Sequence, residues 1–190
     1  MRVIGTVGMP GSGKSEAATV AANAGIPVLV MGDVIRQECR DQGLDPAQHH
    51  GRIAQALRDE HGPGAIAHQS LPIIEDHLTD ATTVLVDGIR SDVEVTTFRD
   101  AFGDDFTLVH VSAPRELREA RIENRDRPGD TDGEPLDARE DRERGFGMDD
   151  AIDLADVRIE NTDSLDAFHD AVRDLLAADT PHTEVPDNHD

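Results

Sequence analysis

The sequence predicts an α/β fold in which helices cover both faces of a parallel β-sheet. Short apolar runs alternate with longer amphipathic segments, as in sheets built from strand–helix–strand units. The first apolar run leads into a glycine-rich loop and then a helix-forming segment. No repeat or second apolar core is visible in the 190 residues. We therefore expect one domain over residues 1–178 and a disordered, polar tail over 179–190.

The first third of the chain begins with a strand over 3–7, a mainly apolar run typical of a buried parallel strand. An alanine-rich helix is expected over 16–24. The next apolar run, 27–31, is bounded by Pro and Gly and predicts a second strand. Helices are then expected over 33–42 and 46–61, where apolar side chains recur on one helical face.

The middle of the chain resumes with a helix over 65–78 after a Pro-Gly pair, and Pro72 predicts a kink in it. Strands are expected at 83–87 and 106–111, where apolar residues cluster. Helices are expected at 92–102 and, with Pro at its start, at 114–125.

The last third opens with a segment rich in Asp, Gly and Pro, 126–137, which predicts a loop or lid. Short helices are expected over 139–144 and 148–155. A fifth strand is expected over 157–159, and an amphipathic helix over 165–177 ends the predicted fold.

The composition is strongly acidic, with 40 acidic against 18 basic residues and a net charge of −22. This charge argues against nucleic-acid and anionic-membrane partners. The single Cys39 cannot form an internal disulfide, which favours a reducing cytoplasm. Asp outnumbers Glu by 27 to 13, and Arg outnumbers Lys by 17 to 1. These ratios are typical of proteins from salt-accumulating halophiles, although an ordinary acidic cytoplasmic protein remains the alternative.

The most informative motif lies between the first strand and the first helix and fits G-x-x-x-x-G-K-[ST], the phosphate-binding P-loop. Its glycines allow backbone N–H groups to surround phosphate oxygens, and the helix N-terminus adds positive potential. Lys14 is the only lysine in the chain, and we expect it to bind the β- and γ-phosphates of ATP as a catalytic residue. The predicted ATP-binding loop consists of Gly8, Met9, Pro10, Gly11, Ser12, Gly13, Lys14 and Ser15.

A magnesium site is expected beside this loop. The Ser15 hydroxyl is the expected P-loop ligand of Mg²⁺. Asp87 ends the buried strand 83–87, where a carboxylate directed at Mg²⁺ belongs, although a simple turn carboxylate is the alternative. With a single lysine, the chain also lacks the N-K-x-D motif of GTPases.

Two further motifs resemble those of small nucleotide-type kinases. Residues 32–36 are similar to the G-D-x-x-R segment of adenylate kinases, and residues 87–90 to their D-G-F-P-R segment, one residue shorter. The resemblance implies a P-loop fold of the nucleoside monophosphate kinase type with strand order 2-3-1-4-5. It also implies that Asp33, Arg36 and Arg90 lie at the acceptor, whose phosphate the arginines bind. A solvated or capping arginine is the alternative for each.

The arginines around the expected lid are candidates for stabilising the transferring phosphoryl group. Arg118, Arg121 and Arg125 follow one another at helical spacings of three and four and share a face. Arg142 follows the loop. We expect Arg121, Arg125 and Arg142 to be catalytic, with a solvated charged face as the alternative.

Residues 155–165 resemble the ending of dephospho-CoA kinases, which implies that Asn161 contacts the adenine of ATP; a turn-forming Asn is the competing interpretation. Over about residues 1–178, the chain also resembles an uncharacterised archaeal family of kinase-like proteins with a D-G-I-R-S motif and a late R-D/E-x-R-E segment, here 139–143.

The expected activity is Mg²⁺-dependent transfer of the ATP γ-phosphate to a small acceptor, with a nucleoside monophosphate favoured over a hydroxyl acceptor of the dephospho-CoA kinase type. A regulator that binds ATP with little turnover remains open, as does the oligomeric state. Residues 130–133 fail the spacing of a calcium loop. His49 and His50 lack a partner set for zinc and are expected to be surface residues.

Overall fold

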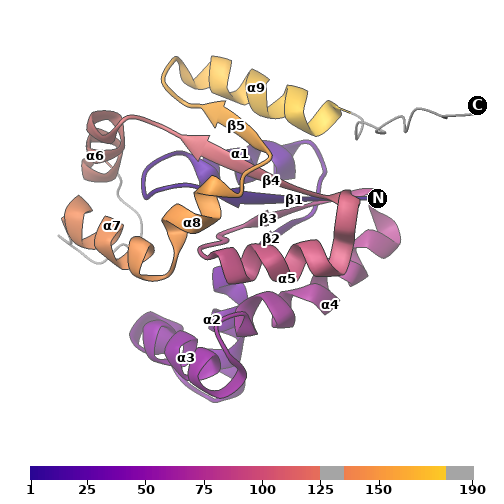
Figure 1. Ribbon diagram of the computed structural model, residues 1–190, viewed down its shortest axis with the longest axis vertical. Helices are drawn as coiled ribbons and strands as arrows, with labels where there is room; N and C mark the ends of the chain where they lie inside the picture. The colour runs from indigo at the N-terminus through magenta and orange to yellow at the C-terminus, as the bar shows by residue number, and fades with distance from the viewer. Residues whose placement is uncertain (125–134, 179–190) are drawn as a thin grey trace, which may run out of the picture.

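The computed structural model describes residues 1–124 and 135–178 as a five-stranded parallel sheet flanked by helices (Figure 1). The strand order is β2-β3-β1-β4-β5, which confirms the predicted order. The strands are β1 (Arg2–Val7), β2 (Val28–Val30), β3 (Thr83–Asp87), β4 (Phe106–Ser112) and β5 (Val157–Glu160). The helices are α1 (Lys14–Asn23), α2 (Met31–Asp41), α3 (Pro46–His61), α4 (Ala65–Asp80), α5 (Asp92–Phe102), the 3₁₀ turn η1 (Gly103–Asp105), α6 (Arg115–Glu123), α7 (Leu136–Gly145), α8 (Met148–Asp153) and α9 (Leu165–Ala177).

The central strand β1 is buried along its whole length, as its Val and Ile residues predict, although it also contains Arg2 and Thr6. It pairs in parallel with β3 on one side and β4 on the other, in a register that sets Thr6 opposite Asp87 and Val7 opposite His110. The carboxyl ends of the strands therefore meet at one edge of the sheet, where parallel α/β folds bind ligands.

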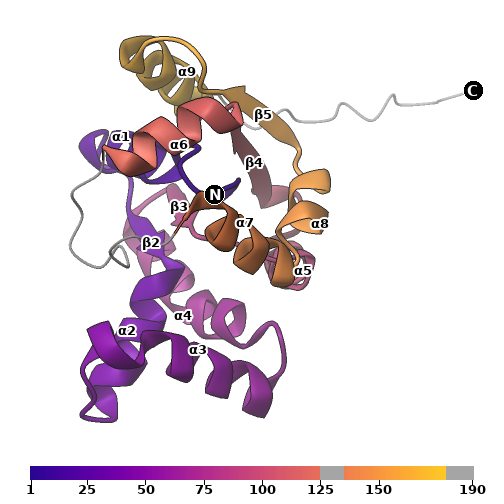
Figure 2. The same cartoon turned by 90° about the vertical axis from the view of Figure 1, so that its left-hand side faces the viewer.

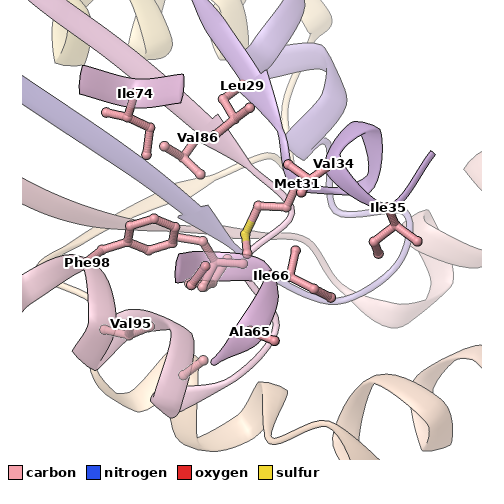
Figure 3. Packing of buried hydrophobic residues seen from close by; sticks show 14 of the residues in the cluster. Leu29, Met31, Val34, Ile35, Ala65, Ile66, Ile74, Val86, Val95 and Phe98 are labelled. Carbon is pink, nitrogen blue, oxygen red and sulfur yellow. The ribbon is translucent and has the colours of Figure 1, made fainter. Parts of the chain in front are cut away.

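Two apolar clusters lie on opposite faces of the sheet. One joins β1 and β3 to α2, α4 and α5, with Phe98 and Ile74 fully buried (Figure 3). The other packs α1 and α9 against the opposite face around Ile4, Leu85 and Phe168. Because each face carries its own apolar layer, the edge at the strand ends is left for polar chemistry.

Several boundaries differ from the sequence-based expectations. Helix α7 begins at Leu136, so the expected loop 126–137 ends earlier; Leu136 is buried and draws its turn into the fold. Residues 125–134 of that loop and the expected tail 179–190 lie outside the described residues. Strand β2 passes directly into α2 at Met31, whose side chain enters the core. Helix α4 continues through Pro72.

Within the described residues, no helix combines the length and the apolar character needed to cross a membrane.

Candidate active site

The P-loop connects β1 to α1 at the carboxyl edge of the sheet. Helix α1 begins at Lys14, and its N-cap Gly13 has φ +115°, a conformation that a side chain would strain. A Cβ on Gly13 would lie 2.3 Å from Nδ2 of Asn161, and one on Gly11 would lie 2.7 Å from the carbonyl oxygen of Arg118. The glycines therefore serve two purposes, since they shape the loop and let neighbouring elements touch its backbone.

The groups that would meet phosphate point into this loop. Nζ of Lys14 donates to the carbonyl oxygens of Gly8 and, at 3.3 Å, of Met9. The Ser12 hydroxyl is buried and has no hydrogen-bond partner among the described residues. A buried polar group without a partner is costly, and a ligand oxygen that reached this hydroxyl would offset that cost.

The predicted magnesium ligands fit the ion in their chemistry. Asp87 ends β3 and is 7 % exposed, and the Thr6 hydroxyl donates to its Oδ1 at 3.0 Å. Ser15 lies in the first turn of α1. A carboxylate and a hydroxyl are oxygen donors of the kind that Mg²⁺ prefers. Among the described residues there is no group of three or more His, Cys, Asp or Glu side chains that could hold an ion unaided, so ATP and water would have to complete the coordination.

Asn161 and Arg121 support the P-loop from outside. The Asn161 side chain is buried and donates to the Ser12 carbonyl oxygen at 2.9 Å. Arg121 donates at 3.0 Å to both oxygens of Asn161 and, more weakly, to the carbonyl oxygens of Gly11 and Ser12. The loop thus depends on β5 and α6, which follow it by more than 100 residues.

These contacts bear on two predicted roles. The Asn161 amide is occupied by the loop backbone and by Arg121, so the structure gives it a bracing contact, and contact with adenine stays a prediction. Arg121 lies at the P-loop as expected, but on its carbonyl oxygens. Arg142 is an exposed residue of α7, and Arg125 lies outside the described residues.

We expect Asn161→Ala to lower the free energy of unfolding by about 1–3 kcal/mol, because the Ser12 carbonyl and the Arg121 guanidinium each lose a buried partner. Affinity for ATP and for GTP should fall together, since the loop that binds the shared triphosphate is loosened. Denaturant unfolding and calorimetric titration of both nucleotides measure this. Asn124→Ala is the matched control, because that exposed amide bonds its own helix. A loss confined to ATP would show instead that Asn161 reads the base.

A buried ion cluster connects α6 to α7, which lie next to each other at this edge of the sheet (Figure 2). Glu140 of α7 is 2 % exposed and contacts Arg118 at 2.6 Å, Arg115 at 3.0 Å and Arg144 at 3.3 Å. Arg118 in turn donates to the Pro10 carbonyl oxygen of the P-loop at 3.2 Å. Removing one partner from such a buried cluster is strongly destabilising. Helix α7 is thereby tied to the P-loop through Arg118.

One of the three predicted acceptor residues, Arg90, lines a cavity. This cavity of about 340 Å³ is lined by Arg90, which follows β3, and by Arg58 of α3. Glu94 and Phe146 also line it. The Arg58 guanidinium lies 5.0 Å from the centre of the Phe146 ring, a cation–π contact. The cavity therefore presents two guanidinium groups, and one of them, that of Arg90, follows the expected magnesium ligand Asp87 by three residues.

The motif residues at the start of α2, Asp33 and Arg36, are not among the residues that line this cavity. Arg36 and Asp33 form an exposed ion pair with each other, at 2.7 Å. The charges of Arg36, Arg90 and Arg58 nevertheless all act on His50. Burial is the main cause that lowers the pKa of His50, the three arginines lower it further, and a hydrogen bond to the Gly32 backbone opposes them. His50 thus lies within electrostatic reach of all three arginines.

Sequence reasoning missed Arg58 and misjudged His50, which is half-buried beside the arginines and not a simple surface residue. A signal was present, because His50, Ala54 and Arg58 follow one another at intervals of four and share one face of α3. Helices α1 and α2 and strand β2 separate this face from the P-loop in sequence, so its position in the fold could not be predicted without the tertiary arrangement.

Comparison with known proteins agrees with this geometry. A family model described as an AAA domain matches residues 7–135. Among solved structures, TT1252 from Thermus thermophilus aligns with a TM-score of 0.63 and 21% identity over 93% of this chain and 96% of that one. Shikimate kinase from Acinetobacter baumannii aligns with a TM-score of 0.55 and 19% identity over 93% of this chain and 91% of that one. These likenesses establish a P-loop kinase fold.

Sequence relatives extend over nearly the whole chain. A UPF0200 protein of Halobacterium salinarum is 98% identical over 190 residues, covering all of both chains. UPF0200 proteins of Methanosarcina mazei and Methanoculleus marisnigri are 44% and 47% identical; each alignment covers 93% of this chain, and 95% and 96% of the relatives respectively. The chain therefore belongs to the UPF0200 family of archaeal proteins.

Proposed function

We propose that this protein transfers the γ-phosphate of ATP to a small phosphate-bearing acceptor, with a nucleoside monophosphate as the favoured class. The observation that carries the proposal is a pair of cationic sites after two adjacent strands of the sheet. The P-loop follows β1, and Arg90 of the cavity follows β3. The P-loop with Lys14 would hold the donor, and the cavity with Arg58 and Arg90 would hold an anion. Paired guanidinium groups suit a phosphate better than a neutral hydroxyl.

In this mechanism catalysis is mainly positioning and electrostatics. Ser15 and Asp87 would hold Mg²⁺, which when bound neutralises charge on the β- and γ-phosphates. Lys14 would move from its loop carbonyl contacts to the phosphates. An acceptor phosphate oxygen is already anionic and needs no general base. Arg121, Arg125 and Arg142 remain candidates for charge stabilisation during transfer.

Two alternative functions predict different results. Hydroxyl phosphorylation is favoured by one observation, the exposed Asp33 carboxylate at the start of α2, held in place by Arg36. As a general base it would be worth about 10²–10⁴ in rate, so Asp33→Asn would collapse kcat. For a monophosphate acceptor the same change costs far less. The second alternative is an ATP-binding regulator, which would form ADP no faster with an acceptor than without one.

The experiment measures ADP formation with Mg²⁺ in concentrated KCl, using nucleoside monophosphates, dephospho-CoA and shikimate as acceptors. We expect a monophosphate to accelerate ADP formation over the acceptor-free rate. Arg90→Ala should raise the KM of that acceptor by about 10–100-fold, the usual effect of losing a charge-assisted hydrogen bond. Arg173→Ala, an exposed arginine of α9, is the matched control. Equal rates with and without every acceptor would contradict the proposal.

A further inference from the structure

The acceptor arginine Arg90 is already occupied by a carboxylate from α7. Oε1 of Glu143 lies 2.8 Å from Nη1 of Arg90, although 53 residues separate the two in sequence. The Glu143 residue is 8 % exposed, and its second oxygen, Oε2, is buried without a hydrogen-bond partner among the described residues. Glu143 thus holds Arg90 through one oxygen only, which is weaker than the two-oxygen contact that a phosphate can make.

The two carboxylates near the cavity are held very differently. Oε2 of Glu94 accepts the Arg90 backbone N–H at 2.8 Å, and the Glu94 backbone is bonded by the N-cap Ser91 of α5. Burial raises the pKa of Glu94, while the Arg90 N–H and the charges of Arg58 and Arg90 oppose that shift. Glu94 therefore belongs to the helix cap and stays in place. Glu143 contacts Arg90 by its side chain alone and is the less firmly held of the two carboxylates.

Helix α7 also forms a wall of the same cavity. Gly145 and Phe146, which follow Glu143, line it, and Arg58 lies over the Phe146 ring. The next residue, Gly147, has φ +99° and caps α8, whose Met148 is buried in the core. The wall formed by Gly145 and Phe146 is therefore anchored at its C-terminal end, just beyond Gly147. Glu143 precedes the wall in the chain.

We propose that Glu143 is an internal competitor for the acceptor's anionic group at Arg90 and thereby sets the specificity of the cavity. The inference rests on the proposed function and deepens it. With Glu143 and Glu94 in place, the carboxylates balance the charges of Arg58 and Arg90. When a monoanionic carboxylate ligand replaces Glu143 at Arg90, one negative charge is exchanged for another, so the electrostatic attraction to Arg90 does not increase. A phosphate dianion brings a second charge and bidentate geometry, so it displaces Glu143 and is selected over carboxylates.

The test titrates AMP, inorganic phosphate and shikimate separately into the full chain in concentrated KCl and measures binding by calorimetry. Glu143→Gln should bind AMP about tenfold more tightly than the natural protein, because the competing charge is gone, and should discriminate less between phosphate and the carboxylate shikimate. Asp141→Asn, which removes an exposed charge from the same helix, should bind AMP like the natural protein. If Glu143→Gln does not fold, Glu143→Asp shortens the competitor and should still tighten binding.

Unchanged or weaker AMP binding by a folded Glu143 variant, with measurable binding by the natural protein, would overturn this inference and leave the proposed function standing. Loss of affinity would show that Glu143 merely supports Arg90. Failure of every form to bind AMP and phosphate would overturn the inference together with the phosphate-bearing acceptor, whereas ATP turnover tests the donor half of the proposed function separately.

Discussion

Lys14→Ala is expected to lower acceptor-dependent ADP formation by about 10²–10³-fold, the usual cost of removing one preorganised group that stabilises developing charge. In the structure Nζ reaches the carbonyl oxygens of Gly8 and Met9, so it lies inside the loop where the β- and γ-phosphates would bind. Because those partners are backbone oxygens at a partly exposed position, the fold should survive the change. Steady-state kinetics and thermal unfolding in concentrated KCl measure the two effects separately.

Lys14→Arg separates charge from geometry. It keeps the positive charge but replaces a compact ammonium by a planar guanidinium, which does not fit a narrow phosphate cradle in the same way. We expect its activity to remain close to that of the alanine variant. Lys14 is also the single lysine among 18 basic residues, so the preference for arginine in the rest of the chain does not extend to this position. Turnover near the natural rate in the alanine variant would refute both a kinase and an ATPase.

The sheet and the P-loop could be predicted because their signals are local. A mainly apolar run such as Val3–Val7 indicates a buried parallel strand, and the spacing from Gly8 to Ser15 indicates a loop whose positive φ angles favour glycine. The location of Asp87 at the carboxyl edge of the sheet could be predicted from its place at the end of a buried strand. The strand order came from a family resemblance, since strand periodicity alone does not say which strands are neighbours.

The supports of the site could not be predicted because each depends on partners far apart in sequence. Glu140 appears as one more charge in an acidic segment, yet it is buried among three arginines. Asn161 follows an edge strand and contacts the P-loop 149 residues earlier. Arg58 joins Arg90 at a cavity only after three helices have packed. Such buried polar contacts leave no periodic pattern in the sequence.

Transfer from concentrated to dilute salt is expected to destabilise the protein substantially. Forty acidic residues face 18 basic ones, so exposed carboxylates repel one another once screening is lost. At about 1 M KCl the Debye length is about 3 Å, which suppresses that repulsion, whereas at about 0.01 M it is about 30 Å. We expect the melting temperature to rise by about 10 °C or more over this range, given about 2–4 °C per kcal/mol for a chain of this size.

Buried ion pairs should contribute little to that salt dependence, because salt screens exposed charges much more than enclosed ones. The Arg118–Glu140 contact at 2.6 Å, with both side chains almost fully buried, should persist at every KCl concentration. A double variant of exposed carboxylates, Glu75→Gln with Glu123→Gln, is the test of cause. It should raise the melting temperature in dilute salt and leave it unchanged in concentrated KCl, because the repulsion it relieves is already screened there. A melting temperature independent of KCl, or a double variant equally stabilised at both extremes, would show that surface repulsion does not govern this fold.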